Sequence, residues 1–172
     1  AKTMEALKLV LPDAKVLVPV IKKIPVKDGE GNLLFEKDEI IYYLAYANED
    51  SSQLLGYAFK SDGNGYSSLI ETMVGIDTIG QITRIKILSQ KETPGLGTLS
   101  EDSQQFTGKK WSTRQFEGKT YEQLKVDKDG GQIVSITGAT ITSRAITNSI
   151  KSKLETLLPQ MGISRDKNAE VN

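Results

Sequence analysis

The sequence predicts an α+β domain with an antiparallel sheet core and a long C-terminal helix. Short apolar, β-branched stretches separated by turn residues fill the middle of the chain, a pattern typical of antiparallel strands. Near the end, Ile146, Ile150, Leu154 and Leu157 recur at steps of four, four and three, so they share one helical face. The segment just before them, residues 135–143, is crowded with hydroxyl side chains and small residues. We therefore expect a sheet, then a tight turn, then an amphipathic helix.

Length and composition indicate one folded domain and exclude several kinds of site. The 172 residues suit a single domain that buries a substantial core. Lys and Arg together number 22 and are balanced by 22 Asp and Glu, so no basic field attracts nucleic acid. The chain has no Cys and no His, which excludes a thiolate nucleophile, an imidazole base and a zinc site. We assign residues 1–162 to the domain and residues 163–172 to a polar tail.

The first half of the chain predicts a short helix and the first strands. Residues 4–11 look helical and end at Pro12, because proline disfavours helix at the residue before it. Pro19 lies inside the first apolar stretch and places that strand at an edge or a bulge. Residues 28–32 form a turn signal rich in Asp, Gly and Asn. The strands expected here are residues 15–23, 40–46 and 54–59.

The second half predicts a hairpin, a short helix and two last strands before the C-terminal helix. The hairpin is formed by residues 69–76 and 81–88, and Pro94-Gly95 after it suits a type II turn. Residues 99–106 read as a short helix capped by Ser100. The last strands are expected at 121–126 and 132–136, and the C-terminal helix is expected to end near Pro159.

The hydroxyl-rich turn at residues 135–143 has two physical interpretations. The first turn of a helix presents N–H groups without partners at a positive end, which is a ready site for a phosphate. Gly138 and Ala139 are small enough to let such a group approach closely. Alternatively, Thr140 or Thr142 acts only as the helix N-cap, a common task for threonine. Five hydroxyls are more than one cap requires, but the pattern alone leaves both interpretations open.

Two sequence blocks resemble a known family. The block Thr137-Gly138-Ala139-Thr140-Ile141-Thr142 resembles the [ST]-G-A-T-x-[ST] signature of covalent flavin-binding domains. These include the G subunit of Rnf-type electron-transport complexes and the C subunit of the sodium-pumping NADH:quinone oxidoreductase. Upstream, Lys91-Glu92-Thr93-Pro94-Gly95-Leu96-Gly97 is similar to the family's E-T-P-G-L-G loop, and Trp111 and Gln115-Phe116 also match. The resemblance covers roughly residues 54–158. Family members usually carry Asp where this chain has Ser135.

The resemblance implies a cofactor and the residues that bind it. It implies that FMN is joined to Thr142 through a phosphoester bond, with the E-T-P-G-L-G loop against the isoalloxazine ring. Lys91, Glu92 and Arg144 are candidates for polar contacts. The cofactor-binding residues expected on this basis are Thr142, Thr140, Ala139, Gly138, Thr137 and Ser143 in the turn, and Glu92, Thr93, Pro94, Gly95, Leu96 and Gly97 in the loop. No metal ligand and no catalytic acid or base is assigned, since the redox chemistry belongs to the flavin.

The same resemblance implies an electron-transfer subunit of a membrane-bound, ion-translocating oxidoreductase complex rather than a free-standing enzyme. Its partners would be the other membrane subunits and a flavin transferase. No apolar run approaches the length of a membrane span. We therefore expect an extracytoplasmic domain, held at the cell membrane by an N-terminal helix that precedes this chain. The alternative function is a noncovalent anion- or flavin-binding module, or a structural partner subunit, in which the turn only caps the helix.

Overall fold

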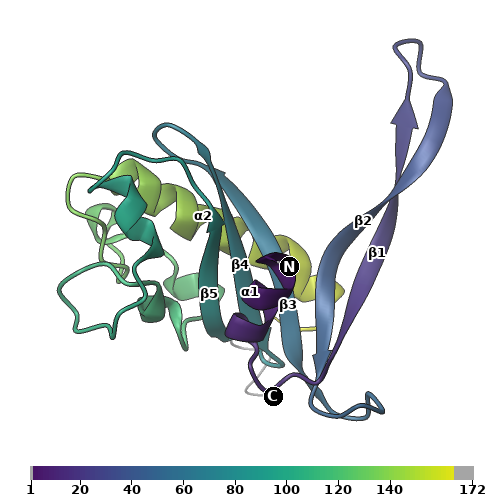
Figure 1. Cartoon of the computed structure of the whole chain (residues 1–172), viewed down its shortest axis with the longest axis horizontal. Helices are drawn as coiled ribbons and strands as arrows, with labels where there is room; N and C mark the ends of the chain where they lie inside the picture. The colour runs from purple at the N-terminus through teal and green to yellow at the C-terminus, as the bar shows by residue number, and fades with distance from the viewer. Residues whose placement is uncertain (1, 165–172) are drawn as a thin grey trace.

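The computed structural model describes residues 2–164, and its centre is a five-stranded antiparallel sheet (Figure 1). The strands pair in chain order, each with the next, so the sheet is a simple meander. This arrangement and a long C-terminal helix confirm the predicted fold class. The strands are β1 (Val16–Lys27), β2 (Leu33–Tyr46), β3 (Leu54–Asn64), β4 (Leu69–Asp77) and β5 (Ile82–Ser89), and the helices are α1 (Lys2–Val10) and α2 (Thr140–Gln160).

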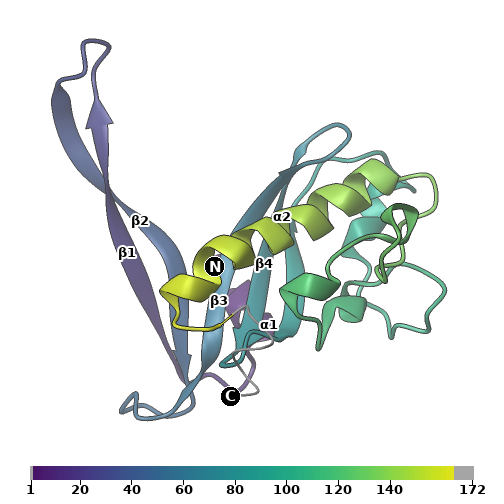
Figure 2. The same ribbon diagram turned by 180° about the vertical axis from the view of Figure 1, so that it is seen from behind.

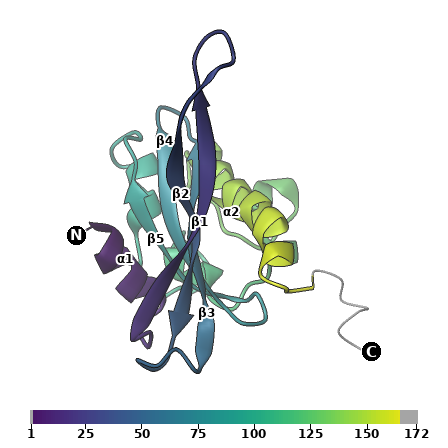
Figure 3. The same cartoon turned by 90° about the vertical axis from the view of Figure 1, so that its right-hand side faces the viewer.

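The two helices cover opposite faces of the sheet, as the side view in Figure 3 shows. Successive side chains of a strand point to opposite faces, and β4 illustrates this clearly. Ile70, Val74 and Ile76 belong to the core beneath α2, whereas Met73 belongs to the core beneath α1. Strands β3, β4 and β5 are therefore buried on both faces, and the domain has three layers.

The larger core lies between the sheet and α2, which crosses the sheet in Figure 2. Its helical side chains are the periodic set expected from the sequence, and Ile146, Ile150 and Leu154 are fully buried. Burying one such side chain stabilises the fold by roughly 1.5–3 kcal/mol. The last turn of α2 includes Pro159, near the expected end of the helix. Most of the expected polar tail, from residue 165 onward, lies outside the described residues.

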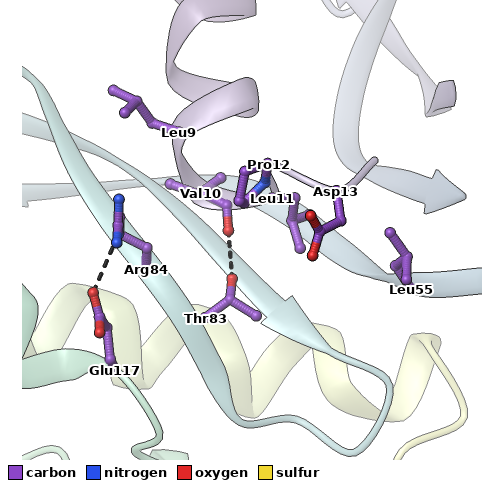
Figure 4. Close-up of a pocket in the computed structure, with 9 residues that line it drawn as sticks. All are labelled: Leu9, Val10, Leu11, Pro12, Asp13, Leu55, Thr83, Arg84 and Glu117. Carbon is purple, nitrogen blue, oxygen red and sulfur yellow. Dashed lines mark hydrogen bonds and ion pairs between the residues drawn. The ribbon is translucent and has the colours of Figure 1, made fainter. Parts of the chain in front are cut away.

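The smaller core joins α1 to the other face of the sheet. Leu7 and Val10 are buried there. Carbonyl groups in the last turn of a helix lack hydrogen-bond partners within the helix. The Val10 carbonyl finds its partner on β5, because the Thr83 hydroxyl donates to it at 2.6 Å (Figure 4). Beside this contact, Arg84 donates to the carboxylate of Glu117 at 3.2 Å. The helix is thus fixed to β5 at its C-terminal end.

The hairpin of β1 and β2 extends beyond the rest of the sheet as a two-stranded arm (Figure 1). β2 pairs with β1 from Leu33 onward but with β3 only over Tyr43–Tyr46. β1 is an edge strand, and its ladder with β2 continues through Pro19, opposite Tyr43, and through Pro25, opposite Glu36. Large apolar side chains are exposed along the distal arm: Ile21, Leu33, Leu34, Phe35 and Ile40.

Two strands expected late in the chain are absent, and that part of the prediction is wrong. Residues 121–126 and 132–136 contribute only one isolated parallel bridge, between Val126 and Ile133, within the described part of the chain. A side chain takes the place of a neighbouring strand, because the Gln115 amide accepts from the Val134 N–H at 2.8 Å and donates to its carbonyl at 3.2 Å. The segment before the hydroxyl-rich turn is therefore extended but lies outside the sheet.

The prediction of a helix at residues 99–106 is also wrong, because only a 3₁₀ turn (Gly97–Glu101) forms there. The Ser100 hydroxyl caps no helix. The backbone carbonyl of Ser100 accepts a hydrogen bond from the Trp111 indole N–H at 3.0 Å. The Asp102 carbonyl accepts from the backbone N–H of Thr113 at 2.8 Å. Tertiary contacts therefore use two carbonyls that a continuing helix would have needed.

Candidate functional site

Three segments far apart in the sequence meet at the start of α2. They are the turn after β3 (residues 65–68), the loop after β5 (residues 92–97) and the hydroxyl-rich turn (residues 135–143). The side chain that joins them is Glu92, which is 5% exposed. The Thr142 hydroxyl donates to Glu92 Oε1 at 2.7 Å, and this bond links the two sequence blocks directly.

The Glu92 carboxylate also accepts hydrogen bonds from the turn at residues 65–68. The backbone N–H of Tyr66 donates to Oε1 at 2.7 Å, and that of Ser67 donates to Oε2 at 3.0 Å. The Ser68 hydroxyl donates to Oε2 at 2.7 Å, whereas the Ser67 hydroxyl, which has one proton, lies 2.7 Å from the Lys91 carbonyl and 3.0 Å from Oε2. Burial by itself raises the pKa of Glu92, but the bonds from Ser68, Thr142 and the two backbone N–H groups outweigh it and lower the pKa to about 2. Glu92 is therefore a buried anion with both carboxylate oxygens hydrogen-bonded.

Two glycines make room for this carboxylate. A Cβ atom at Gly65 would overlap Glu92 Oε1, and one at Gly97 would overlap Glu92 Cβ. The Gly97 Cβ would also lie 3.0 Å from the Thr142 hydroxyl oxygen. The backbone of Gly97 thus closes over Thr142, which is 1% exposed.

The loop after β5 contains the type II turn that Pro94-Gly95 predicts. Gly95 has a φ of +76°, and the backbone N–H of Leu96 donates to the Thr93 carbonyl at 3.0 Å. This turn directs Leu96 toward the second block, where a Cβ atom at Gly138 would lie 3.2 Å from Leu96 Cδ2. Leu96 remains 39% exposed. It therefore presents an apolar surface beside the start of α2.

Helix α2 begins without a side-chain cap, so the interpretation of Thr140 or Thr142 as its N-cap is wrong. The N-cap residue is Ala139, which has no side chain capable of capping, and Thr140 is the first helical residue. The Thr142 hydroxyl is directed at Glu92 instead. Ser143 holds the turn, because its hydroxyl accepts from the Ile136 N–H and donates to the Ala139 carbonyl, both at 2.9 Å. The N–H groups of the first helical turn therefore remain available to a ligand.

A carboxylate lies beside the position where this sequence departs from the family pattern. The Ser135 hydroxyl donates to Asp127 Oδ1 at 2.6 Å, and this hydrogen bond lowers the pKa of Asp127 against the opposing effect of burial. Arg144, on the second turn of α2, makes a bidentate ion pair with Asp129, in which Nε donates to Oδ2 at 2.9 Å and Nη2 donates to Oδ1 at 2.7 Å. Both interactions tie the segment at 127–129 to the start of the helix.

The structure brings both predicted blocks to one place, although their residues differ in exposure. Thr137, Gly138, Thr93, Pro94, Gly95 and Leu96 are exposed, Thr140 is half-buried, and Ala139, Thr142, Ser143, Glu92 and Gly97 are buried. The residues expected at the site did not include the turn residues Tyr66, Ser67 and Ser68, which join it through Glu92. Nor did they include Ile141, which is 50% exposed on the first turn of α2.

Comparison with known proteins decides the family. Residues 65–155 match the family described as FMN-binding domain. The chain belongs to the FMN-binding domain family. The G subunit of the ion-translocating oxidoreductase complex of Vibrio vulnificus (strain YJ016) is 32% identical over 162 residues, which cover 86% of this chain and 74% of that protein. The G subunit of the proton-translocating ferredoxin:NAD(+) oxidoreductase complex of Clostridium ljungdahlii is 36% identical over 114 residues, covering 64% and 57% respectively.

The fold of this FMN-binding domain also has a counterpart among solved structures. The C subunit of the Na(+)-translocating NADH-quinone reductase from Parabacteroides distasonis aligns with a TM-score of 0.60 over 95% of this chain and 94% of that one. Sequence identity is 18%, so this likeness shows the shared fold alone. Within residues 2–164, neither helix combines the length and apolar character needed to cross a bilayer.

The residues at the start of α2 fit FMN, the family's cofactor. The uncapped first turn offers backbone N–H groups and a positive helix end to a phosphate, and Gly138 and Ala139 leave it room. The side chains of Leu96 and Ile141 are exposed and offer apolar surface to a flat ring. The flavin supplies one-electron redox chemistry when bound, and the chain supplies its position and its electrostatic surroundings.

Proposed function

We propose that this chain is an electron-transfer subunit that carries FMN as a phosphoester on Thr142. The observation that carries the proposal is the convergence of both family blocks on one hydroxyl at the uncapped start of α2. A phosphodiester at Thr142 keeps one negative charge beside the free N–H groups of the first turn. An anion at a helix N-terminus gains roughly 0.3–1 kcal/mol, and more where it is partly buried.

Thr142 is preferred over the neighbouring threonines because it occupies the last position of the family signature. Thr137 precedes Gly138 and lies outside the helix, and Thr140 is the first helical residue. Glu92 and Gly97 surround Thr142, whereas the exposed Leu96 is placed to contact the ring. Ser143 is assigned the task of holding the turn, since both hydrogen bonds of its hydroxyl are made within it.

Attachment is tested by co-expressing the chain with a flavin transferase and reading in-gel fluorescence under denaturing conditions. The wild-type band should fluoresce, and intact mass should increase by one FMN less one water. Thr142→Ala should abolish the band, Thr142→Ser should retain part of it, and Thr140→Ala should at most weaken it. A bright band from Thr142→Ala would contradict the assignment.

We further infer that the chain works within a membrane-bound, ion-translocating oxidoreductase complex, with this domain on the extracytoplasmic side. Support for the complex comes from the relatives, whose names describe them as G subunits of ion-translocating and proton-translocating oxidoreductase complexes. Because the chain has no Cys, the substitution Glu49→Cys at an exposed residue would create a unique label site. In intact cells a membrane-impermeant maleimide should label it. Labelling only after the cells are lysed would contradict the proposed side.

One observation favours a second function, noncovalent FMN binding. The Thr142 hydroxyl is buried and bonded to Glu92, whereas an acceptor must be reached by its phosphorus donor. A noncovalent flavin would use the same N–H groups and the same Leu96 surface without reacting. The denaturing gel separates the two functions, because only an ester-linked flavin remains with the chain.

A further inference from the structure

Strands β2 and β3 pair with each other over only part of their length. The pairing runs from Tyr43 opposite Ala58 to Tyr46 opposite Leu54, next to the loop that joins the two strands. Before Tyr43, β2 belongs to the arm with β1, whereas β3 continues beyond Ala58 at the side of β4 (Figure 1). The sheet is therefore split, and a gap separates residues 33–42 of β2 from residues 59–64 of β3.

Both strands leave backbone groups without a partner strand along this gap. In an antiparallel pair, residues alternate between those that exchange hydrogen bonds with the neighbouring strand and those that do not. Residues 33–42 pair with β1 and residues 59–64 pair with β4, and no strand within residues 2–164 pairs with the other side of either segment. Every second N–H and C=O therefore faces the gap. An open edge of this kind accepts an added strand.

A hollow of about 570 Å³ lies in the gap. It is lined by β2 at residues 38–43, by β3 from Phe59 and by the second half of α2. Three of its lining side chains, Tyr42, Phe59 and Leu157, belong to the core beneath α2 and give the hollow an apolar side. Because side chains of a strand alternate between its two faces, a strand in this gap needs apolar residues only at every second position.

The charges around the hollow balance. It is lined by three lysines and three acidic residues: Lys22, Lys60, Lys153, Asp38, Glu39 and Asp62. A mixed lining of this kind has no field that concentrates an anionic lipid surface or a highly charged peptide. The occupant that fits is a nearly neutral, extended peptide segment with alternating apolar and polar residues.

The open edge of β3 leads directly to the candidate flavin site. β3 ends at Asn64, and the turn that follows it donates hydrogen bonds to Glu92. Gly63 lies against the second turn of α2, since a Cβ atom at this residue would overlap the Ala145 carbonyl. A strand added along residues 59–64 would therefore bring the protein that carries it to the start of α2.

We propose that the gap between β2 and β3 is a docking site for another protein subunit, which adds an extended segment of alternating apolar and polar residues to the open edge of β3. The backbone of β3 supplies the hydrogen bonds, and the apolar side of the hollow selects the side chains. The arm forms the opposite wall. Naming the partner as a subunit of the oxidoreductase complex rests on the proposed function, and docking here places that subunit beside the flavin.

Hydrogen–deuterium exchange resolved to single residues tests the docking. It compares this chain alone with the membrane complex purified through a tag on this chain. In the chain alone, every second amide of residues 59–64 should exchange quickly, because it faces the gap, whereas the others are bonded to β4. In the complex, the fast amides should slow by about tenfold or more, since each donates to the added strand.

Thr156→Trp is the blocking variant. Thr156 is exposed and lines the hollow, so the indole takes the place of the added strand without removing a buried group. Purified through the same tag, the variant should show the fast exchange of the chain alone, whether or not other subunits are recovered with it. Its melting temperature alone should equal that of the wild type, which shows that the fold is intact.

Glu155→Trp is the matched control, because Glu155 is the preceding residue of α2 and is exposed but does not line the hollow. It should keep the slow exchange of the wild-type complex. Fast exchange in Glu155→Trp as well, or slow exchange in Thr156→Trp, would overturn the assignment of the docking site to this hollow.

The remaining outcomes separate this inference from the proposed function. Equally fast exchange in the wild-type complex and in the chain alone would overturn the docking and leave membership of the complex intact. Slow exchange in the chain alone would also overturn it. A slowing that grows with protein concentration would assign the gap to a second copy of this chain, and one that does not would assign it to closure of the arm on β3. A tagged wild-type chain recovered without other subunits would overturn the proposed complex and the partner named here.

Discussion

Leu96 lies against Gly138, so that a Cβ atom at Gly138 would come within 3.2 Å of the leucine Cδ2. The two residues belong to the two separate family blocks, and their contact lies beside the uncapped first turn of α2. A leucine held there by a type II turn is 39% exposed and offers apolar surface beside the proposed phosphate position. This relationship supports the proposal that the loop contacts the flavin ring while the helix end binds the phosphate.

Replacing Leu96 with Glu should therefore change the flavin and not its attachment. A carboxylate beside the ring disfavours the added negative charge of the reduced flavin, so we expect a lower reduction potential and a shifted absorption spectrum. Spectroelectrochemistry of the co-expressed protein measures both. Leu99→Glu is the matched control, since Leu99 is 46% exposed on the following 3₁₀ turn, and it should leave the potential near the wild-type value. Loss of the fluorescent band in Leu96→Glu would show that the loop is needed for attachment itself.

The flavin-free domain should lose stability in acid through Glu92. Its pKa is lowered from the ordinary value of 4.5 to about 2 in the folded state, because its hydrogen bonds outweigh the effect of burial. A folded-state pKa below the unfolded-state one stabilises the fold fully above pH 4.5, and that stability is lost as the pH falls toward 2. Urea unfolding between about pH 7 and pH 2 measures this. Glu92→Gln should be less stable at neutral pH and show a smaller loss across this window. An unchanged slope would contradict the account of Glu92.

Two glycine substitutions in the same loop should differ in their cost. Gly95 has a positive φ, but a Cβ atom there meets nothing within 4 Å, so Gly95→Ala should cost only the backbone strain of about 1–2 kcal/mol. A Cβ atom at Gly97 would overlap Glu92, so Gly97→Ala should cost about 3 kcal/mol, at the upper end for overpacking. Denaturant unfolding of the flavin-free proteins gives both values. Equal costs would mean that Gly97 does not need to approach Glu92 closely.

The fold itself should form without flavin. The core between the sheet and α2 is built from fully buried side chains of the chain alone, including Ile146, Ile150 and Leu154. The flavin-free domain should unfold cooperatively and retain near-UV circular dichroism. Ile150→Ala should then cost about 2–5 kcal/mol, whereas the control Ile79→Ala, at a residue that is 62% exposed, should change stability by less than about 0.5 kcal/mol. A molten flavin-free domain would contradict this view.

Periodicity in the sequence was sufficient to predict α2 and the central strands, because burial on a defined face decides those elements. It failed at residues 121–136, where the apolar pattern suggests strands but the Gln115 side chain, rather than a strand, satisfies the Val134 backbone. The resemblance identified both blocks of the site. No local rule indicated that the Thr142 hydroxyl would turn away from its own helix end, since its partner Glu92 lies fifty residues earlier.

Pro19 and Pro25 have a consequence for how this domain behaves in concentrated solution. β1 is an edge strand, and such edges can template the addition of a strand from another molecule. Proline has no backbone N–H, and the ladder with β2 continues through both prolines. Their backbone nitrogens therefore face the open side of β1, where no hydrogen bond to β2 is needed. An incoming strand would forgo two hydrogen bonds there, each worth roughly 0.5–1.5 kcal/mol net. The long arm can therefore extend into solvent with its outer edge protected against the growth of intermolecular β-sheets.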